Sequence, residues 1–142
     1  MKILALDTET TIFNKGNAYD KRNKLVCYSA IREGYPAWAA KWDNQALIDV
    51  QEEILNASLI VFFNGKFDLP WLKKYGIDFS SVKVWDVQIA EFILSNQTNR
   101  FPSLNETCLK YNIPIKEDVV KTEYWDKGID TDQIHWEILS SY

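Results

Sequence analysis

The order of predicted elements indicates an α/β fold with one mixed sheet and helices on its faces. Three strand-like segments come first, at 3–6, 25–31 and 35–42, and a tight turn at Glu33-Gly34 joins the second to the third. Three consecutive strands predict an antiparallel meander at the N-terminus. The chain then alternates between helices and strands, a combination that is typical of a mixed sheet.

The middle of the chain predicts a helix, a strand and a second helix. Asn44 is the expected N-cap of a helix over 45–56. The apolar side of that helix comprises Ala46, Leu47, Val50 and Ile54. The run 59–63 is a short apolar segment typical of a buried strand. The helix after it carries Asp68 in its opening turns, and Pro70 fits this helix only within the first turn.

Shorter elements are expected next, namely a strand at 82–85 and helices at 86–95 and 103–111. Asp86 is interpreted as the N-cap of the first of these helices, because Asp is common at that position. Ser103 and Glu106 have the spacing of a capping box at the start of the second. Trp71 and Trp85 are the tryptophans most expected in the core.

The last part of the chain predicts a loop and a final helix. The polar segment 116–128 is expected to be irregular and to pack back through Tyr124 and Trp125. Asp130, Thr131 or Asp132 would then cap a helix that runs to the chain end. His135 is expected to be an ordinary surface residue of that helix.

Composition limits the class of protein. The 142 residues suit a single domain, 1–142, with a substantial core. A formal charge of −4 argues against a broad basic surface that grips duplex DNA, but it allows a narrow cleft that takes a few nucleotides. Cys27 and Cys108 have no metal-ligand spacing, and neither a signal peptide nor a membrane span is visible, so a reduced, cytoplasmic protein is expected.

The chemistry is expected at the end of the first strand. Asp7 and Glu9 are two positions apart, so both carboxylates should project to the same side as Ile3 and Ala5. A hard cation such as Mg²⁺ or Mn²⁺ would relieve the repulsion between them. The alternative is a strand that runs out into a polar turn. Asp68 would be kept ionised by its helix N-terminus, although an ordinary capping role explains the same placement.

Two motifs in this order resemble a known family. Asp-Thr-Glu-Thr at 7–10 and Asn-x-x-Phe-Asp at 64–68 resemble the first two motifs of the DEDD 3′–5′ exonucleases. The resemblance is closest to the proofreading domains of family A DNA polymerases and to their free-standing phage relatives, and it continues through Trp85-Asp86 to Tyr142. It implies a ribonuclease H-like fold, in agreement with the predicted order of elements.

The resemblance also implies a mechanism and a set of site residues. The family hydrolyses single-stranded DNA 3′ ends with two divalent ions, Mg²⁺ or Mn²⁺, of which one activates the attacking water and the other stabilises the leaving oxygen. Asp7, Glu9 and Asp68 match its metal ligands. Tyr142 matches the third-motif tyrosine that orients the water, although an aromatic residue at a chain end has an ordinary explanation too.

One part of the family pattern is missing from the sequence. The fourth carboxylate would follow four residues beyond Tyr142, where the sequence stops. Either the sequence belongs to a longer exonuclease or it is a natural truncation, and weak activity is expected of it as it stands.

The resemblance suggests further contacts, partners and a location. Thr10 and Phe13 match the region that contacts the terminal nucleotide, although Phe13 equally suits the core. Asn64 would contact substrate or cap the following helix. A DNA polymerase is a further expected partner, and a bacterial or phage-infected cell the expected location. The alternatives are an exonuclease that trims RNA and a non-catalytic module that binds nucleic acid or a replication partner.

Overall fold

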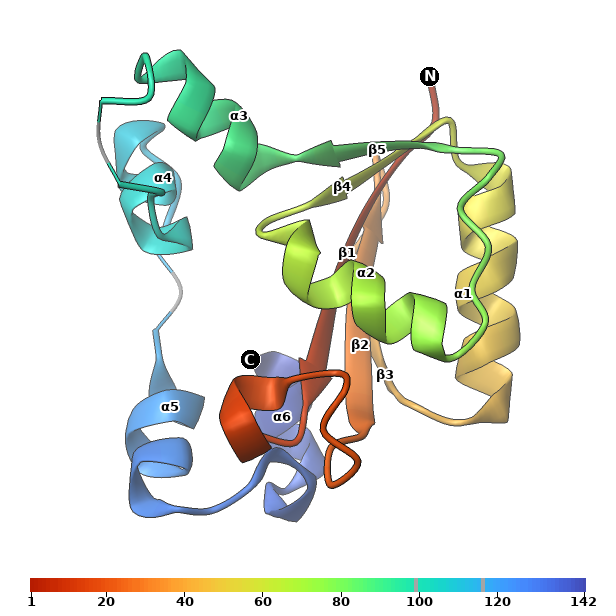
Figure 1. The fold of residues 1–142 in the computed structure, drawn as a ribbon, viewed down its shortest axis with the longest axis vertical. Helices are drawn as coiled ribbons and strands as arrows, with labels where there is room; N and C mark the ends of the chain where they lie inside the picture. The colour runs from red at the N-terminus through yellow and green to blue at the C-terminus, as the bar shows by residue number, and fades with distance from the viewer. Residues whose placement is uncertain (99, 116) are drawn as a thin grey trace.

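The computed structural model describes residues 1–98, 100–115 and 117–142, and it contains one five-stranded sheet (Figure 1). The strand order across the sheet is β3-β2-β1-β4-β5. The strands are β1 (Ile3–Thr10), β2 (Leu25–Arg32), β3 (Trp38–Lys41), β4 (Leu59–Phe62) and β5 (Lys83–Asp86). The first strand of the chain is therefore the central strand of the sheet.

The sheet is mixed, as the sequence predicts. β1 pairs antiparallel with β2, and β2 pairs antiparallel with β3, which confirms the N-terminal meander. β4 is parallel to β1 and β5 is parallel to β4. The fold is α/β and ribonuclease H-like in this arrangement of antiparallel and parallel strands.

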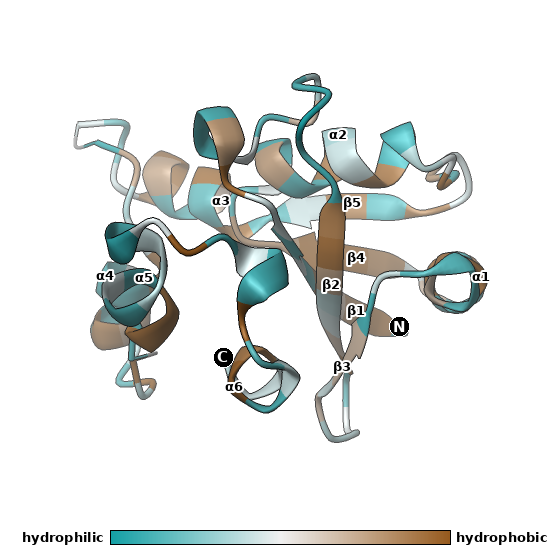
Figure 2. Cartoon of the chain, turned by 90° about the horizontal axis from the view of Figure 1, so that it is seen from below, coloured by the Kyte–Doolittle hydropathy of each residue, from teal (hydrophilic) through white to brown (hydrophobic). Residues whose placement is uncertain are grey.

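Helices pack around the sheet and continue beyond its β5 edge (Figure 1). The α-helices are α1 (Asn44–Asn56), α2 (Gly65–Lys74), α3 (Val87–Leu94), α4 (Leu104–Lys110), α5 (Val119–Glu123) and α6 (Trp136–Ser141). Three short 3₁₀ turns are η1 (Phe13–Gly16), η2 (Trp125–Lys127) and η3 (Thr131–Gln133). In Figure 2, α1 is seen nearly end-on beside the sheet, and α6 lies near the C-terminus on another side.

The main core lies between one face of the sheet and helices α1 and α2. Alternate residues of the strands point into it, among them Leu4, Leu6, Tyr28, Ile60 and Phe62. Ala46, Val50 and Ile54 enter it from α1, and Leu72 enters it from α2. This burial confirms the apolar side predicted for the first helix.

The other sheet face is covered only in part. Cys27 of β2 packs with Val120 of α5, with Ile134 and with Leu139 of α6, and Tyr124 and Trp125 pack against this second cluster. The packing of these two aromatic residues is as predicted.

Part of that same face stays open. The cross-strand pairs Ala5–Ile31, Ala5–Val61 and Val61–Trp85 form one row of side chains across four strands. Ile31 is 43% exposed and Trp85 is 53% exposed at the two ends of the row. We call these four residues the open row. Trp71, in contrast, is fully buried in a core cluster as expected.

Four local predictions need correction. Asp43, not Asn44, caps α1, because the Asp43 carboxylate accepts the Ala46 N–H at 2.8 Å. Pro70 is the sixth residue of α2, beyond the first turn, where it has no N–H to donate to the carbonyl four residues earlier. Trp85 is not a core residue, because it lies on an edge strand over the uncovered part of the sheet.

The fourth correction concerns the C-terminal segment. The stretch expected to be a loop contains α5 and η2, and its first residue, Lys116, lies outside the described residues. The expected final helix is divided into η3, capped by Asp130, and α6, whose N-cap position is His135. No helix in the described part of the chain is long and apolar enough to cross a membrane. Cys27 and Cys108 are not joined in a disulfide.

Candidate active site

Alternation along β1 brings Asp7 and Glu9 to one side of the sheet. Leu4, Leu6 and Thr8 are buried towards the main core, whereas Asp7 is exposed and Glu9 is half-buried. The two carboxylates therefore share the face of Ile3 and Ala5, as the two-residue spacing predicts.

Asp7 and Glu9 lie in a cleft of about 720 Å³. Its other polar lining residues include Asn64, Asp118 and Tyr142. The α3–α4 side of the cleft is largely apolar and includes Val87, Leu104, Cys108, Tyr111 and Ile113. The wall formed by β1 thus carries the Asp7 and Glu9 carboxylates, and we call it the acidic wall. The α3–α4 wall is mainly apolar.

Asp68 is held directly behind the acidic wall. Its side chain is only 2% exposed, and one carboxylate oxygen, Oδ1, accepts hydrogen bonds from the Thr8 N–H at 3.0 Å and the Thr8 hydroxyl at 2.7 Å. These bonds fasten the start of α2 to β1, between Asp7 and Glu9. Asp68 does not line the cleft surface.

Burial and the neighbouring Asp7 raise the pKa of Asp68 to about 7, although the hydrogen bonds from Thr8 act in the opposite direction. Burial and the second carboxylate outweigh the favourable helix dipole, so the helix N-terminus does not keep Asp68 fully ionised at neutral pH, contrary to the expectation. The capping alternative is not supported either, because the Asp68 carboxylate accepts hydrogen bonds from Thr8 of β1.

The N-terminus of α2 is capped from a distant part of the chain. The backbone N–H groups of Asn64 and Gly65 donate to the Asp86 carboxylate at 3.2 and 2.8 Å. The same carboxylate accepts the N–H groups of Gln88 and Ile89 at the start of α3. Asp86 is thus the N-cap of its own helix, as predicted, and also an acceptor for a second helix, which the local sequence did not indicate.

Asn64 combines a left-handed backbone with a side-chain amide oxygen that has no hydrogen-bond partner in the described part of the chain. Its backbone is left-handed, with φ 65°, and its side chain makes no cap hydrogen bond to α2. The amide oxygen, Oδ1, is buried and is without a hydrogen-bond partner among the described residues. Because Asn64 lines the cleft, this buried acceptor stands beside the space that a ligand would enter.

Tyr142 lines the same cleft. It follows α6, its ring meets the Trp125 ring edge-on with centroids 6.0 Å apart, and its hydroxyl donates to Asp118 Oδ1 at 3.0 Å. Burial, the hydrogen bond to Asp118 and the charge of Glu9 raise the pKa of Tyr142 above its usual range. The phenol therefore keeps its proton at neutral pH.

Asp118 is an acidic residue of this cleft that the sequence did not reveal. It was placed in an expected loop, and it lies 24 positions from Tyr142. The local pattern carries no signal for it, because the contact depends on how α5 and α6 pack together.

Two expected substrate residues lie elsewhere. Thr10 is 4% exposed on the core side of β1, and its hydroxyl donates to the Thr11 carbonyl at 3.0 Å, so its side chain does not enter the cleft. Phe13 is exposed and lines a separate pocket, with the Arg22 guanidinium 5.0 Å from its ring centroid.

The acidic residues of the described part of the chain do not form a preorganised metal-binding site. In residues 1–98, 100–115 and 117–142, no three side chains of Asp, Glu, His or Cys are grouped so that they hold a metal ion as they stand. The donor set is nevertheless suited to a hard cation, because a buried carboxyl whose pKa is raised by a neighbouring carboxylate gains from a positive charge between them.

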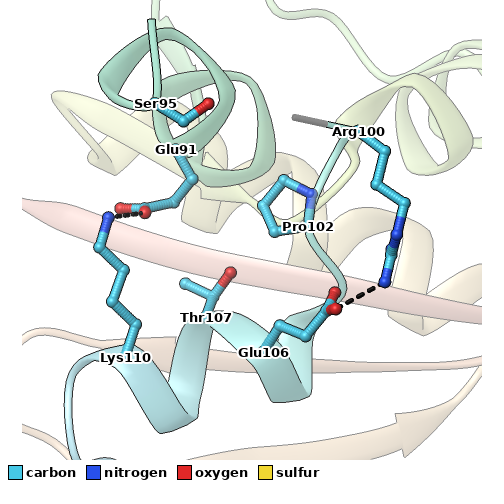
Figure 3. A pocket seen from close by; sticks show the side chains of 7 residues that line it. All are labelled: Glu91, Ser95, Arg100, Pro102, Glu106, Thr107 and Lys110. Atoms are coloured by element: carbon cyan, nitrogen blue, oxygen red, sulfur yellow. Dashed lines mark hydrogen bonds and ion pairs between the residues drawn. The ribbon is translucent and has the colours of Figure 1, made fainter. Parts of the chain in front are cut away.

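A second pocket, of about 550 Å³, lies between α3 and α4 (Figure 3). Its charged side chains are already paired. Lys110 Nζ lies 2.6 Å from Glu91, and an Arg100 nitrogen lies 2.6 Å from Glu106 (Figure 3). The hydrogen bond from Lys110 holds the pKa of Glu91 below its usual range. These ion pairs join the two helices, so the pocket offers little unpaired charge to a ligand.

Comparisons with solved structures show the same fold at low sequence identity. A family B DNA polymerase from Pyrobaculum calidifontis has a TM-score of 0.62 and 14% identity over 89% of this chain. NrnC from Brucella melitensis, with bound Mg²⁺, has a TM-score of 0.53 and 21% identity over 82% of this chain. A structure described as the apo form of a nuclease has a TM-score of 0.57 and 18% identity over 82% of the chain.

The chain spans only part of each of these proteins. It covers 21% of the polymerase chain and about 55% of the two nuclease chains. No match was found among the curated proteins.

The sequence itself matches a family model described as 3′-5′ exonuclease, of the type found in family A DNA polymerases, over residues 1–138. The match includes the strand that carries Asp7 and Glu9, the helix that carries Asp68, and the first half of α6. On this evidence the chain belongs to the 3′–5′ exonuclease domain family.

Proposed function

We propose that this chain is a metal-dependent exonuclease domain that hydrolyses single-stranded DNA from the 3′ end. The observation that carries the proposal is the placement of three acidic residues. Asp7 and Glu9 share a cleft with Tyr142, and the Asp68 carboxylate is bonded to Thr8 between them. The family match supports nuclease activity in general, and the net charge of −4 favours a site for a few nucleotides of a single strand over a broad surface that binds duplex DNA.

We propose that Asp7, Glu9 and Asp68 are the metal ligands, with Mg²⁺ or Mn²⁺ as the ion. Carboxylate oxygens suit both ions. A bound divalent ion would lower the pKa of an attacking water and stabilise the leaving 3′ oxygen, and a complete site would hold two. Because no three acidic side chains of the described residues are grouped to hold an ion as they stand, a shared ion would require a change of side-chain rotamer at one of the three residues.

The other cleft residues take roles that follow from their chemistry. Tyr142 keeps its proton, so its oxygen is a neutral group that orients a water without attacking the phosphate itself. Asn64 Oδ1 is a buried acceptor and would bind an N–H or O–H group of the terminal nucleotide. The apolar α3–α4 wall would contact a base. Phe13 remains a proposed stacking residue, outside this cleft.

The test is digestion of a single-stranded oligonucleotide that carries a fluorophore at its 5′ end. With Mn²⁺ or Mg²⁺ and excess protein, the products should shorten one nucleotide at a time from the 3′ end, and EDTA should stop the reaction. Asp7→Asn should abolish this ladder. Asp49→Asn, which removes a half-buried carboxylate of α1 outside the cleft, is the matched control and should not change it.

Metal binding is measured separately by calorimetric titration with Mn²⁺. Asp7→Asn should remove the binding heat, whereas Asp49→Asn should preserve it. Equal binding by the wild type and Asp7→Asn would place the metal elsewhere and contradict the assignment of ligands.

The second candidate is a non-catalytic module that binds nucleic acid or a replication partner such as a DNA polymerase. It is favoured by the finding that no three ligands are grouped for a metal among the described residues. Binding of the oligonucleotide in a fluorescence anisotropy titration, with no metal-dependent shortening, would support it. Parallel digestion of an RNA oligonucleotide of the same sequence separates DNA from RNA as substrate. Either substrate suits the proposed location, the cytoplasm of a bacterial or phage-infected cell.

A further inference from the structure

We infer that Asp118 is a positioning residue for Tyr142, which holds the tyrosine hydroxyl so that its oxygen faces the acidic cleft as a hydrogen-bond acceptor. The inference rests on the proposed exonuclease function, because it concerns the group that would orient the attacking water. It adds a residue that the two sequence motifs do not contain.

The position of Asp118 first suggests an ordinary helix cap, and its contacts argue against that role. It occupies the N-cap position of α5, yet its side chain makes no hydrogen bond to the N–H groups of that helix. Its carboxylate instead accepts the Tyr142 hydroxyl at 3.0 Å. The side chain of Asp118 therefore connects α5 to the residue that follows α6, within the lining of the cleft.

The hydrogen-bonding capacity of a phenol explains why this contact matters. A tyrosine hydroxyl has one proton to donate and lone pairs with which to accept. A carboxylate can only accept, so the proton of Tyr142 points at Asp118, and the bond is strengthened by the charge of the acceptor. With its proton directed at Asp118, the Tyr142 oxygen can act towards a water in the cleft only as an acceptor.

The ring of Tyr142 is held by a second contact. Trp125 packs edge-on against it at an interplanar angle of 81°, which fixes the ring plane while Asp118 fixes the hydroxyl rotor. Removing the Asp118 carboxylate would leave the ring in place and free the hydroxyl to rotate. The expected consequence is a water that is bound but poorly oriented.

The test compares five proteins of the same length: the wild type, Asp118→Leu, Tyr142→Phe, the two substitutions together, and Glu117→Leu. Glu117 is the matched control, because it is an exposed acidic neighbour outside the cleft lining. Single-turnover oligonucleotide digestion with protein in excess makes slow rates measurable. Asp118→Leu should lower the rate constant roughly tenfold or more, as misplaced reacting groups do, without changing the half-saturating concentrations of Mn²⁺ and oligonucleotide.

The double substitution separates positioning from other roles. If Asp118 acts through the Tyr142 hydroxyl, Asp118→Leu should cause no further loss in the Tyr142→Phe background. An equal loss in both backgrounds, or a higher half-saturating Mn²⁺ concentration, would overturn the inference, since either result indicates a direct role at the metal. Asp118→Glu, which keeps a carboxylate acceptor, should recover part of the lost rate.

A spectroscopic measurement tests the hydrogen bond without catalysis. In protein labelled with ¹³C at tyrosine Cζ, the Tyr142 resonance, identified by its loss in Tyr142→Phe, should move in Asp118→Leu and stay in place in Glu117→Leu. An unmoved resonance overturns the inference whatever the activity. A wild type without metal-dependent hydrolysis overturns the proposed function and the positioning role with it. A wild type that digests DNA no faster than Asp118→Leu overturns the positioning role alone.

Discussion

Asp68 is a buried carboxyl group under opposing influences, since the Thr8 hydrogen bonds favour its ionised form whereas burial and Asp7 favour its protonated form. Burial and Asp7 have the larger effect, so the pKa of Asp68 is raised in the folded protein. The folded protein therefore keeps this proton at pH values at which the unfolded chain has released it. Without divalent ions, the free energy of unfolding should therefore fall as pH rises from the ordinary value of 3.8 to about 7.

Urea denaturation in EDTA at a series of pH values measures this slope. Asp68→Asn should flatten it, because the amide does not titrate, whereas Asp49→Asn should leave it unchanged. Addition of Mn²⁺ near pH 7 should raise the free energy of unfolding of the wild type, because the ion binds the ionised carboxylates of the folded state. A slope that is the same in Asp68→Asn would show that another group titrates.

Thr8 offers a second prediction at the scale of one residue. Thr8→Val keeps the shape of the side chain and the backbone N–H bond, but it removes the hydroxyl that donates to Asp68 at 2.7 Å. The loss should cost roughly 1–3 kcal/mol of unfolding free energy. It should also raise the pKa of Asp68 further, which is measured as a shift of the pH-dependent slope to higher pH. Thr10→Val removes another buried hydroxyl and should cost stability without that shift.

At the scale of elements, Asp86 joins two helices and a single side chain sets the geometry of both. It accepts N–H groups from the start of α2 and from the start of α3, whereas Asp43 caps α1 alone. Asp86→Ala should therefore lower the unfolding free energy by roughly 2–3 kcal/mol, against about 1 kcal/mol for Asp43→Ala, the typical value for one cap. Urea denaturation of both variants checks this, and equal losses would mean that the α2 contact contributes little.

Local patterns predicted the elements of this protein better than the contacts between them. The capping box of Ser103 and Glu106 and the cap of Asp86 on its own helix are short-range patterns, and both are present. The hydrogen bonds from the Asn64 N–H to Asp86 and from the Tyr142 hydroxyl to Asp118 join residues more than 20 positions apart. Such pairs depend on how helices pack on the sheet, which residue spacing does not encode.

In the candidate site too, features set by local residue spacing were predicted and features set by tertiary packing were not. The shared face of Asp7 and Glu9 follows from the two-residue period of a strand and was predicted. The exposure of Trp85 was not predicted, because an apolar strand residue can face either a covered or an uncovered part of a sheet. The pKa of Asp68 was predicted in the wrong direction, since the sequence does not reveal how deeply a carboxyl group is buried.

At the scale of the whole molecule, the open row is an apolar strip across four strands of the sheet, exposed at its two ends, Ile31 and Trp85. Such strips bind hydrophobic dyes and promote association. Trp85→Gln should reduce the fluorescence enhancement of anilinonaphthalene sulfonate and lower self-association in sedimentation velocity, with little change in Tm. Tyr19→Ser, at an exposed aromatic residue outside the open row, should leave both unchanged. Equal dye binding by all three proteins would contradict this prediction.

The central position of β1 has a consequence for how long each half of the cleft persists when the protein fluctuates. A strand paired on both sides exchanges its amide hydrogens mainly through global unfolding, whereas a short helix such as the six-residue α6, with the residue that follows it, opens locally more often. Asp7 and Glu9 belong to the first kind of segment and Tyr142 to the second. The Asp7 and Glu9 carboxylates therefore keep their positions while Tyr142 moves away and returns. The fraction of time in which α6 is packed in place sets an upper limit on the fraction of molecules in which Asp7, Glu9 and Tyr142 are together in the cleft.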